Sequence, residues 1–149
     1  MNISFDLDST LIPNGKEFET EKISEIAELF GVEKIRKGTR SLISDLQKEG
    51  NKIHIYTTSF RTKRKIRFTL WYYGIKVNQI VTQEENQRIL KLRKISSSKY
   101  PTAFDFDIHV DDSRGVGIEA EKFNFKAIII EPCEINWVEK IKSQIKNVG

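Results

Sequence analysis

The sequence contains one cysteine and no long apolar run, and these two shortages exclude several classes of protein. Cys133 cannot form an internal disulfide, and there is no second cysteine with which it could build a thiolate metal site. The longest strongly aliphatic run, residues 127–130, is far too short to span a bilayer, and no N-terminal segment resembles a signal peptide. We therefore expect a cytoplasmic protein without a membrane partner.

Internal repeats and low-complexity linkers are also missing from the 149 residues. A hydrophobic content of 38% suits one packed core, so we expect residues 1–149 to form a single domain. The formal net charge of +4 favours anionic partners, although so small an excess is common among enzymes of phosphorylated metabolites. The expected partner is a phosphorylated substrate, small or large, with nucleic acid left open. We expect a monomer or a small homo-oligomer.

Short apolar segments alternate with longer amphipathic, charged segments, which is typical of alternating strands and helices. Five strands are predicted from their β-branched and aromatic residues, at 3–5, 53–56, 77–81, 106–110 and 127–130. Helices are predicted at 19–30, 39–48, 61–73, 117–123 and 137–145. Because each strand is almost continuously apolar, we predict an α/β fold with a mostly parallel five-stranded sheet covered by helices on both faces.

Two pairs of carboxylates follow strands of this sheet. Asp6 and Asp8 come after the first strand, and Asp111 and Asp112 come after the fourth. The carboxyl ends of the strands form the ligand site of open α/β sheets, so neighbouring first and fourth strands would bring these side chains together. Clustered carboxylates repel one another unless a cation neutralises them, and oxygen ligands favour Mg²⁺. Zinc would require more histidine or cysteine.

The strand at 53–56 is followed by candidate phosphate ligands. Thr57, Thr58 and Arg61 offer hydroxyl and guanidinium groups that can hold a phosphate together with backbone N–H groups. His54 and His109 lie within predicted strands, where we expect packed side chains rather than ligands, and we assign neither a role.

The acidic and hydroxyl motifs resemble those of the haloacid dehalogenase (HAD) superfamily of phosphohydrolases over nearly the whole chain. The stretch FDLDST, residues 5–10, is similar to the first motif of that family. This resemblance implies a Rossmann-like fold, with Asp6 as the nucleophile and Asp8 as the general acid and base. Thr10 would fix the turn beside the phosphate. An aspartyl-phosphate intermediate would form on Asp6 and then be hydrolysed.

The resemblance extends to the second and fourth motifs. Thr57, with Thr58 as its rival, matches the strand-ending hydroxyl that binds the phosphoryl group. The stretch VDDS, residues 110–113, is similar to the fourth motif and implies that Asp112 binds Mg²⁺ directly while Asp111 supports it, or the reverse. Mg²⁺ would also contact Asp6 and the backbone carbonyl of Asp8.

The third motif of the family is a lysine or arginine that stabilises the phosphorylated aspartate. We choose Lys99, in the loop before the fourth strand, over Lys91 and Lys94 on a plausible preceding helix. In many members a longer helix follows this lysine, whereas here only a short connection does.

The segment after the first strand bears on how open the site is. Asn14-Gly15 is a strong hairpin-turn signal, and a hairpin flap follows the first strand in the HAD superfamily. Between this flap and Lys37 there is room for about one helix. We therefore predict a short hairpin flap and no substantial cap.

Two rival classes are weighed against a phosphatase. The run at 61–67 is the most basic of the chain, so a non-catalytic or partner-completed binding module could use it to hold a polyanion. Binding alone has no use for both Asp6 and Asp8, which argues against that alternative. A signalling receiver domain also has an acidic pair, a threonine and a lysine on a five-stranded parallel sheet, but the motifs occur in a different order there.

Overall fold

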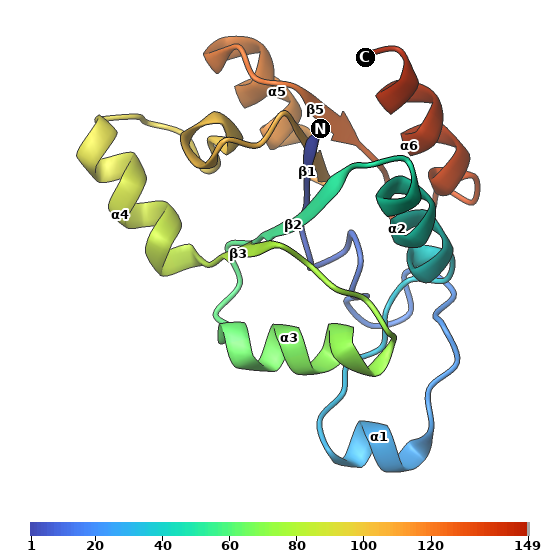
Figure 1. Ribbon diagram of the computed structural model, residues 1–149. Coiled ribbons are helices and arrows are strands. Elements are labelled where there is room, and N and C mark those ends of the chain that lie inside the picture. Colours follow the sequence, from blue (N-terminus) through green and yellow to red (C-terminus); the bar gives the residue numbers. More distant parts are fainter. Residues whose placement is uncertain (149) are drawn as a thin grey trace.

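The computed structural model describes residues 1–148, and within them the strands form a five-stranded parallel sheet (Figure 1). Adjacent strands lie in the order β3-β2-β1-β4-β5, and Ile3 of β1 pairs with Ile53 of β2 and Ile108 of β4. The predicted α/β fold is confirmed, and the first and fourth strands are neighbours. The strands are β1 (Asn2–Phe5), β2 (Lys52–Tyr56), β3 (Gln79–Val81), β4 (Ile108–Asp111) and β5 (Ala127–Ile129).

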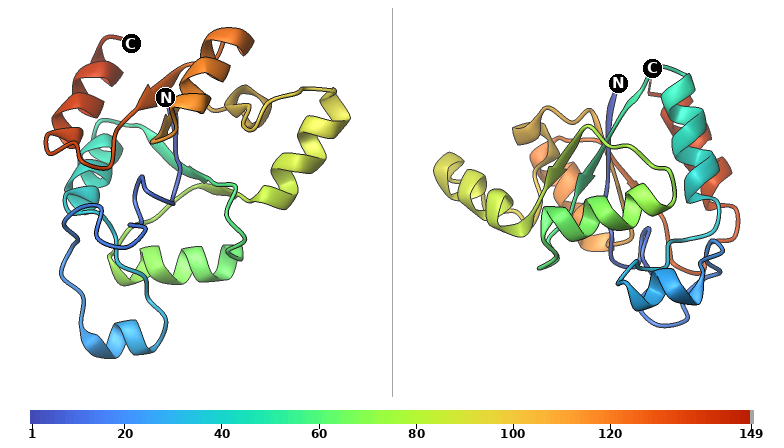
Figure 2. Two further views of the ribbon diagram at one scale, coloured as in Figure 1. Left: turned by 180° about the vertical axis from the view of Figure 1, so that it is seen from behind. Right: turned by 60° about the horizontal axis from the view of Figure 1, so that its bottom comes forward.

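Helices cover both faces of the sheet (Figure 2). Because side chains alternate along a strand, Ile3, Phe5 and Ile55 face one side, where the largest apolar cluster joins them to α2, α3 and α6. Smaller clusters on the other side involve α5 and a 3₁₀ turn. The helices are α1 (Glu25–Leu29), α2 (Thr39–Lys48), α3 (Lys63–Tyr72), α4 (Gln83–Arg93), α5 (Arg114–Phe123) and α6 (Trp137–Lys146), and the 3₁₀ turn is Pro101–Phe104.

The first helix is much shorter than the predicted helix at 19–30. The Ser24 side chain accepts a hydrogen bond from the Ala27 backbone N–H and caps α1 at that point. Before the cap, Thr20 forms an antiparallel bridge with Arg36, which keeps the chain extended. Gly31, at a φ of 87°, follows the helix. The α1 excursion, residues 20–36, therefore leaves the sheet and returns to it, with α1 at its tip (Figure 1).

The hairpin flap expected around Asn14-Gly15 is not formed, because residues 14–18 are a run of bends without strand pairing. Gly15 does adopt the left-handed conformation that the dipeptide favours, at a φ of 77°. The preceding residues are not free to form a strand, however, because the Ile12 N–H donates to the Leu7 carbonyl in a tight turn. Glu17 then closes the loop by accepting from the Asn14 N–H at 2.8 Å.

Arg36 fastens the end of the α1 excursion to the loop after β5. Its guanidinium is only 2% exposed and lies between the rings of Phe18 and Trp137, 4.5 and 4.8 Å from their centroids. Its Nη2 atom donates to the carbonyls of Glu131, Pro132 and Glu134.

Among the helices of the described residues, none is both long and apolar enough to cross a membrane.

His54 makes the folded protein sensitive to acid. Its side chain is 6% exposed, it packs against Phe106, and both ring nitrogens are buried without a hydrogen-bond partner. Burial and the nearby charge of Lys52 lower the pKa of His54 below its ordinary value of 6.5. Below that pH the unfolded chain therefore binds a proton that the folded chain does not, so stability falls as the pH falls.

We expect His54→Phe to remove this part of the pH dependence. The histidine contributes up to about 1.4 kcal/mol of destabilisation per pH unit below 6.5, until the folded protein also binds the proton. Urea unfolding at pH 7.5 and 5.5, in the presence of chelator, measures the loss for each protein. An equal loss of unfolding free energy in wild type and His54→Phe would contradict the prediction.

Candidate active site

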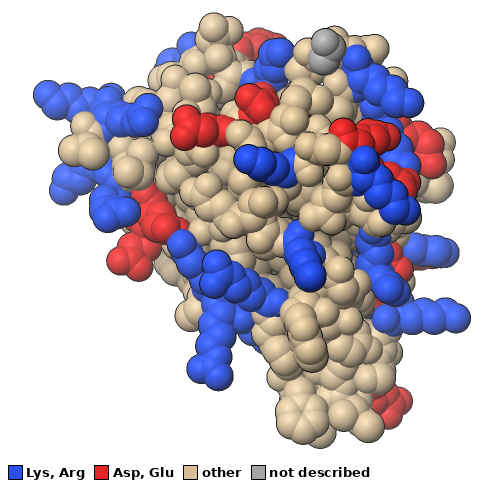
Figure 3. All heavy atoms as spheres, viewed as in Figure 1, with Lys and Arg blue, Asp and Glu red and all other residues tan. Residues whose placement is uncertain are grey.

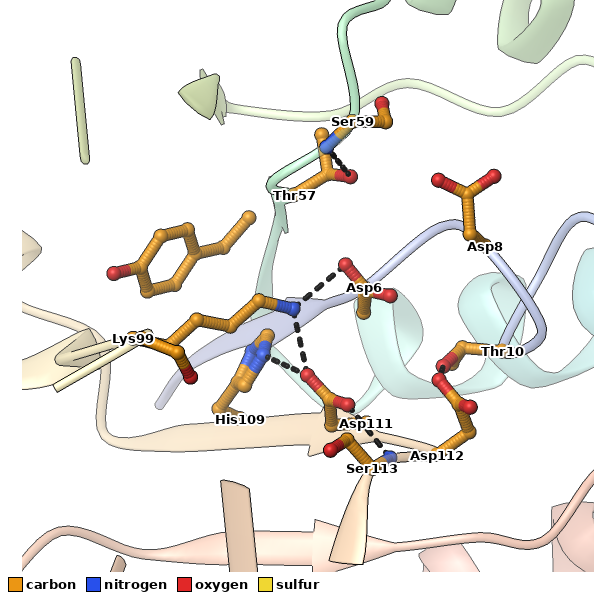
Figure 4. Close-up of polar contacts among 12 residues, drawn as sticks. Asp6, Asp8, Thr10, Thr57, Ser59, Lys99, His109, Asp111, Asp112 and Ser113 are labelled. Atoms are coloured by element: carbon orange, nitrogen blue, oxygen red, sulfur yellow. Dashed lines mark hydrogen bonds and ion pairs between the residues drawn. The ribbon is translucent and has the colours of Figure 1, made fainter. Parts of the chain in front are cut away.

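Asp6 and Asp8 stand at the carboxyl end of β1 but in different surroundings. The Asp6 N–H still donates to the Val110 carbonyl of β4 at 2.9 Å, and the residue as a whole is only 7% exposed. Leu7 is fully buried in the apolar core, so its side chain points away from the site. Asp8 is exposed and lies at the rim, where the chain turns through Ser9 at a φ of 57° (Figure 4).

Three carboxylates converge where β1 and β4 end. Oxygen atoms of Asp6, Asp111 and Asp112 lie within 4.8 Å of one another, which is close enough for them to hold one metal ion. The oxygen-only donor set fits a hard cation. The Asp8 carboxylate is not in this group. The group that Asp8 was expected to offer to the metal ion is its backbone carbonyl, which does not depend on where the carboxylate lies. The predicted convergence of the two acidic pairs is therefore found for three of the four side chains.

Lys99 bridges two of these carboxylates. Its Nζ donates to Asp6 Oδ1 at 2.7 Å and to Asp111 Oδ2 at 2.6 Å, and the side chain is 4% exposed (Figure 4). The rivals Lys91, on α4, and Lys94, just after it, are exposed. The structure thus brings Lys99, and neither rival, against the expected nucleophile.

Several hydrogen bonds fix the loop that carries Lys99. Asn86 of α4 donates to the Ser98 carbonyl at 2.7 Å, and Glu119 of α5 accepts from the Ser98 N–H at 2.8 Å. On the other side of the lysine, the Tyr100 N–H donates to the Tyr56 hydroxyl at 2.9 Å. The Lys99 ammonium group is therefore held beside Asp6 and Asp111 by the fixed loop, and it does not have to move in from solvent when a substrate binds.

Burial and charge move the pKa values of the three carboxylates in different directions. Burial raises the pKa of Asp6, against the opposing charge of Lys99. Burial and the charge of Asp111 raise the pKa of Asp112. Burial would also raise the pKa of Asp111, but the hydrogen bond from His109 and the charge of Lys99 hold it well below its usual range. The site is thus short of positive charge at Asp6 and Asp112, where a divalent cation would supply it.

His109, to which the sequence assigned no role, contacts the site. Its Nε2 lies 2.9 Å from Asp111 Oδ2 and its Nδ1 lies 2.9 Å from Ser4 Oγ. A signal for this was present in the sequence: His109 and Asp111 are two residues apart on one strand, so they share a face. His54, by contrast, packs as expected and touches no carboxylate of the site among the described contacts.

The three threonines expected to bind phosphate differ in whether their hydroxyls already take part in hydrogen bonds. Thr57 is buried at the end of β2, and its hydroxyl accepts from the Ser59 N–H at 3.1 Å beside Asp6 (Figure 4). Thr58 is half-buried, and no polar contact is found for its side chain among the described residues. Thr10 is fully buried, and its hydroxyl donates to Asp112 Oδ1 at 3.1 Å. Thr10 therefore orients a candidate metal ligand instead of pointing freely at a phosphate.

Arg61 connects the rim of the site to the α1 excursion. Its Nη1 donates to Asp8 Oδ1 at 2.7 Å, and its Nε donates to both carboxylate oxygens of Glu33, at 3.0 and 2.8 Å. The guanidinium thus lies beside the expected general acid, already engaged by two carboxylates. A phosphate would have to compete for it.

Several basic side chains of the run at 61–67 are engaged in contacts within the protein. Lys63 pairs with Glu85 at 2.7 Å, and Lys65 donates to the Gly31 carbonyl. Arg64 and Arg67 are exposed on α3, and Figure 3 shows lysine and arginine side chains projecting from that region. The surface left for a polyanion is therefore smaller than the sequence suggests.

Neither protein-family models nor curated proteins match this chain. One solved structure, described as a predicted HAD-like family hydrolase from Porphyromonas gingivalis, matches with a TM-score of 0.53 and 16% identity, over 97% of each chain. Another, from the structure of the Pnkp1/Rnl/Hen1 RNA repair complex, matches 87% of this chain with a TM-score of 0.55 and 14% identity. This chain spans only 42% of that second one. At such identities the likenesses establish the fold alone: this chain shares the α/β fold of the structure described as a predicted HAD-like hydrolase.

Proposed function

We propose that the protein is a Mg²⁺-dependent phosphatase of the HAD type that acts on phosphomonoesters. One observation carries the proposal: a buried lysine holds Asp6 inside a cluster of three carboxylates at the end of two neighbouring strands. A structural ion pair needs one carboxylate, whereas this arrangement gathers excess negative charge at the carboxyl edge of the sheet. The fold likeness to a HAD-like hydrolase supports the same reading.

The donor set fits Mg²⁺, which Asp6 and Asp112 would hold together with the Asp8 carbonyl. When bound, the ion would neutralise carboxylate and phosphate charge and so permit their approach. Asp112 is better suited than Asp111 to bind it directly, because both oxygens of Asp111 already accept hydrogen bonds, from Lys99, His109 and the Ser113 N–H. Asp111 would then support Lys99.

The chain's own groups account for the two chemical steps. In the first, Asp6 Oδ2 attacks phosphorus, an acyl-phosphate bond forms, and the bond to the leaving oxygen breaks while Asp8 donates a proton to that oxygen. In the second, Asp8 removes a proton from water, which attacks phosphorus and releases inorganic phosphate and free Asp6. Lys99 balances charge on the phosphoryl oxygens in both steps. The Thr57 hydroxyl, at the end of β2, would bind one of these oxygens.

Arg61 would act at the entrance. We infer that an incoming phosphate takes over the contact that Arg61 makes with Asp8 and thereby frees Asp8 to hold a proton. Glu33 keeps the guanidinium in place during that exchange through two hydrogen bonds. Asp8 is exposed, so it can exchange protons with water between the two steps.

Hydrolysis of p-nitrophenyl phosphate tests the proposed function. We expect turnover by the purified protein with Mg²⁺ and none with EDTA. Asp8→Asn should lower kcat by about 10²- to 10⁴-fold, because it removes general acid and base catalysis while leaving Asp6 and Lys99 in place. Metal-independent turnover, or an Asp8→Asn variant as active as wild type, would contradict the proposed mechanism.

A further inference from the structure

A cleft opens beside Asp8, between the first turns of α3 and α4. It has a volume of about 560 Å³ and is lined by residues 59–63, residues 82–85 and Arg88. Ser59 and Arg61 connect it to the candidate site, because Arg61 contacts Asp8 and the Ser59 N–H contacts Thr57. A volume of this size suits a single small-molecule group.

The position of the cleft relates it to one part of a substrate. If Asp8 protonates the leaving oxygen, as the proposed function holds, the leaving alcohol must lie on the Asp8 side of the phosphorus atom. The cleft begins on that side, next to the guanidinium that contacts Asp8. It is therefore placed to receive the leaving group, and this inference rests on the proposed function.

The lining offers a stacking surface at the mouth. Phe60 is 96% exposed, although it lies in the short connection between strand β2 and helix α3. A phenyl ring left in water beside a cleft provides a face on which a planar ring can stack, and such stacking is favourable for every nucleobase. Arg88 is exposed on α4 and lines the cleft from that helix.

Two residues that line the cleft carry polar atoms without a partner. Ser59 Oγ and Gln83 Oε1 are both buried from solvent without a hydrogen bond. An amide oxygen can only accept, so Gln83 calls for a ligand N–H or O–H donor. A buried acceptor that stays unpaired costs free energy, and a ligand that supplies the donor recovers it.

The charges of the cleft argue against a second phosphate as the bound group. Lys63 is paired with Glu85 across the cleft at 2.7 Å, and Arg61 is engaged by Asp8 and Glu33. Arg88 shares its helix with Glu84, which also lines the cleft. The remaining positive charge is small, so the lining suits a neutral ring that carries hydrogen-bond donors.

We propose that the cleft binds the base of a nucleoside, so that the substrate is a nucleoside phosphate whose phosphoryl group reaches Asp6. The base stacks on Phe60, and the Gln83 side chain turns into the cleft so that its Oε1 accepts a hydrogen bond from the base. The nucleoside phosphate can be a free mononucleotide or the phosphorylated end of an oligonucleotide, since both present the same group to the cleft.

Equilibrium binding to the Asp6→Asn protein, in which turnover is blocked, tests this proposal. The probes are adenosine 5′-monophosphate, adenosine 3′-monophosphate and glycerol phosphate, titrated calorimetrically with Mg²⁺ present. We expect at least one of the adenosine phosphates to bind about tenfold more tightly than glycerol phosphate. Adding Phe60→Ala should weaken that binding by about 5- to 100-fold and leave glycerol phosphate within about twofold.

Two further variants complete the design. Gln83→Leu should also weaken binding of the adenosine phosphate alone, because it removes the acceptor without opening a cavity. Leu92→Ala is the matched control: Leu92 is an exposed apolar residue on α4 that does not line the cleft, so its removal should change neither affinity. Thermal unfolding of each variant confirms that the fold is retained.

Equal affinities for adenosine and glycerol phosphates would overturn the proposal, as would an adenosine preference that survives both Phe60→Ala and Gln83→Leu. Neither result bears on the proposed function, which fails separately if p-nitrophenyl phosphate is not hydrolysed.

Binding of an oligonucleotide with a terminal phosphate identifies the source of the nucleoside. If it binds more tightly than the mononucleotide and with the same dependence on Phe60, the polymer end is the ligand. Tighter binding without dependence on Phe60 would overturn the proposal for the cleft.

Discussion

Replacing Asp6 with asparagine should lower kcat for p-nitrophenyl phosphate by about 10⁴-fold or more. The amide cannot attack phosphorus as a carboxylate does, and neither Asp111 nor Asp8 is placed to take over this role. Asp111 accepts hydrogen bonds at both oxygens, and Asp8 points to the rim. A loss of 10⁴ corresponds to about 5.5 kcal/mol of transition-state stabilisation.

The substitution should leave the fold intact, which makes the loss interpretable. Lys99 keeps its ion pair with Asp111 at 2.6 Å, and the asparagine side chain has nearly the shape of aspartate. Asp45→Asn is a suitable control, because that exposed carboxylate pairs with Lys142 on the surface and should change kcat very little. Residual activity of Asp6→Asn within tenfold of wild type would rule out Asp6 as the nucleophile.

The strand ends were the most predictable part of the site. Apolar strands buried on both faces are short and stop where polar residues begin, so the positions of Asp6, Thr57 and Asp111 followed from local sequence. The parallel order of the strands then brings these ends to one edge. Apolar residues at helical spacing before Gly50 placed α2 at residues 39–48, the bounds it has in the structure.

Features that depend on contacts between distant segments were predicted poorly. The shortening of the first helix depends on the bridge between Thr20 and Arg36, two positions with no local signal for pairing. The hairpin at Asn14-Gly15 failed for a local reason, because the tight turn between Leu7 and Ile12 holds the residues that would have formed its first strand. The contact between His109 and Asp111 was missed for a different reason: the two residues share a face of one strand, and this local signal was not used. That residues 1–149 form one domain stays a prediction.

Lys99 illustrates how a site residue can be chosen without any local signal in the sequence. Its choice over Lys91 and Lys94 came from a family resemblance, and no local pattern separates the three. What distinguishes Lys99 is a tertiary fact: hydrogen bonds through Asn86 and Glu119 turn its loop toward the sheet. Once the loop is fixed, burial of the ammonium group is tolerated only because two carboxylates face it.

Lys99→Met should therefore destabilise the metal-free protein by about 3–5 kcal/mol at pH 7, because it removes the only ammonium group that the described contacts place between two buried carboxylates. Urea unfolding in EDTA measures the loss. Methionine fills nearly the same volume, so the loss reports charge rather than a cavity. Lys91→Met, on the exposed face of α4, is the matched control and should stay within about 0.5 kcal/mol of wild type.

Two conditions should reduce the defect, and both follow from the same electrostatic cause. Added Mg²⁺ should recover much of the lost stability, because a divalent cation bound by Asp6 and Asp112 replaces the missing positive charge. Lower pH should also narrow the difference from wild type. Without Lys99, the folded protein would bind a proton at these carboxylates more readily than the unfolded chain, so the stability of the variant relative to wild type rises as the pH falls. A Lys99→Met protein that is as stable as wild type in EDTA, or whose stability does not respond to Mg²⁺, would show that the carboxylates do not form the charged cluster on which the proposed chemistry depends.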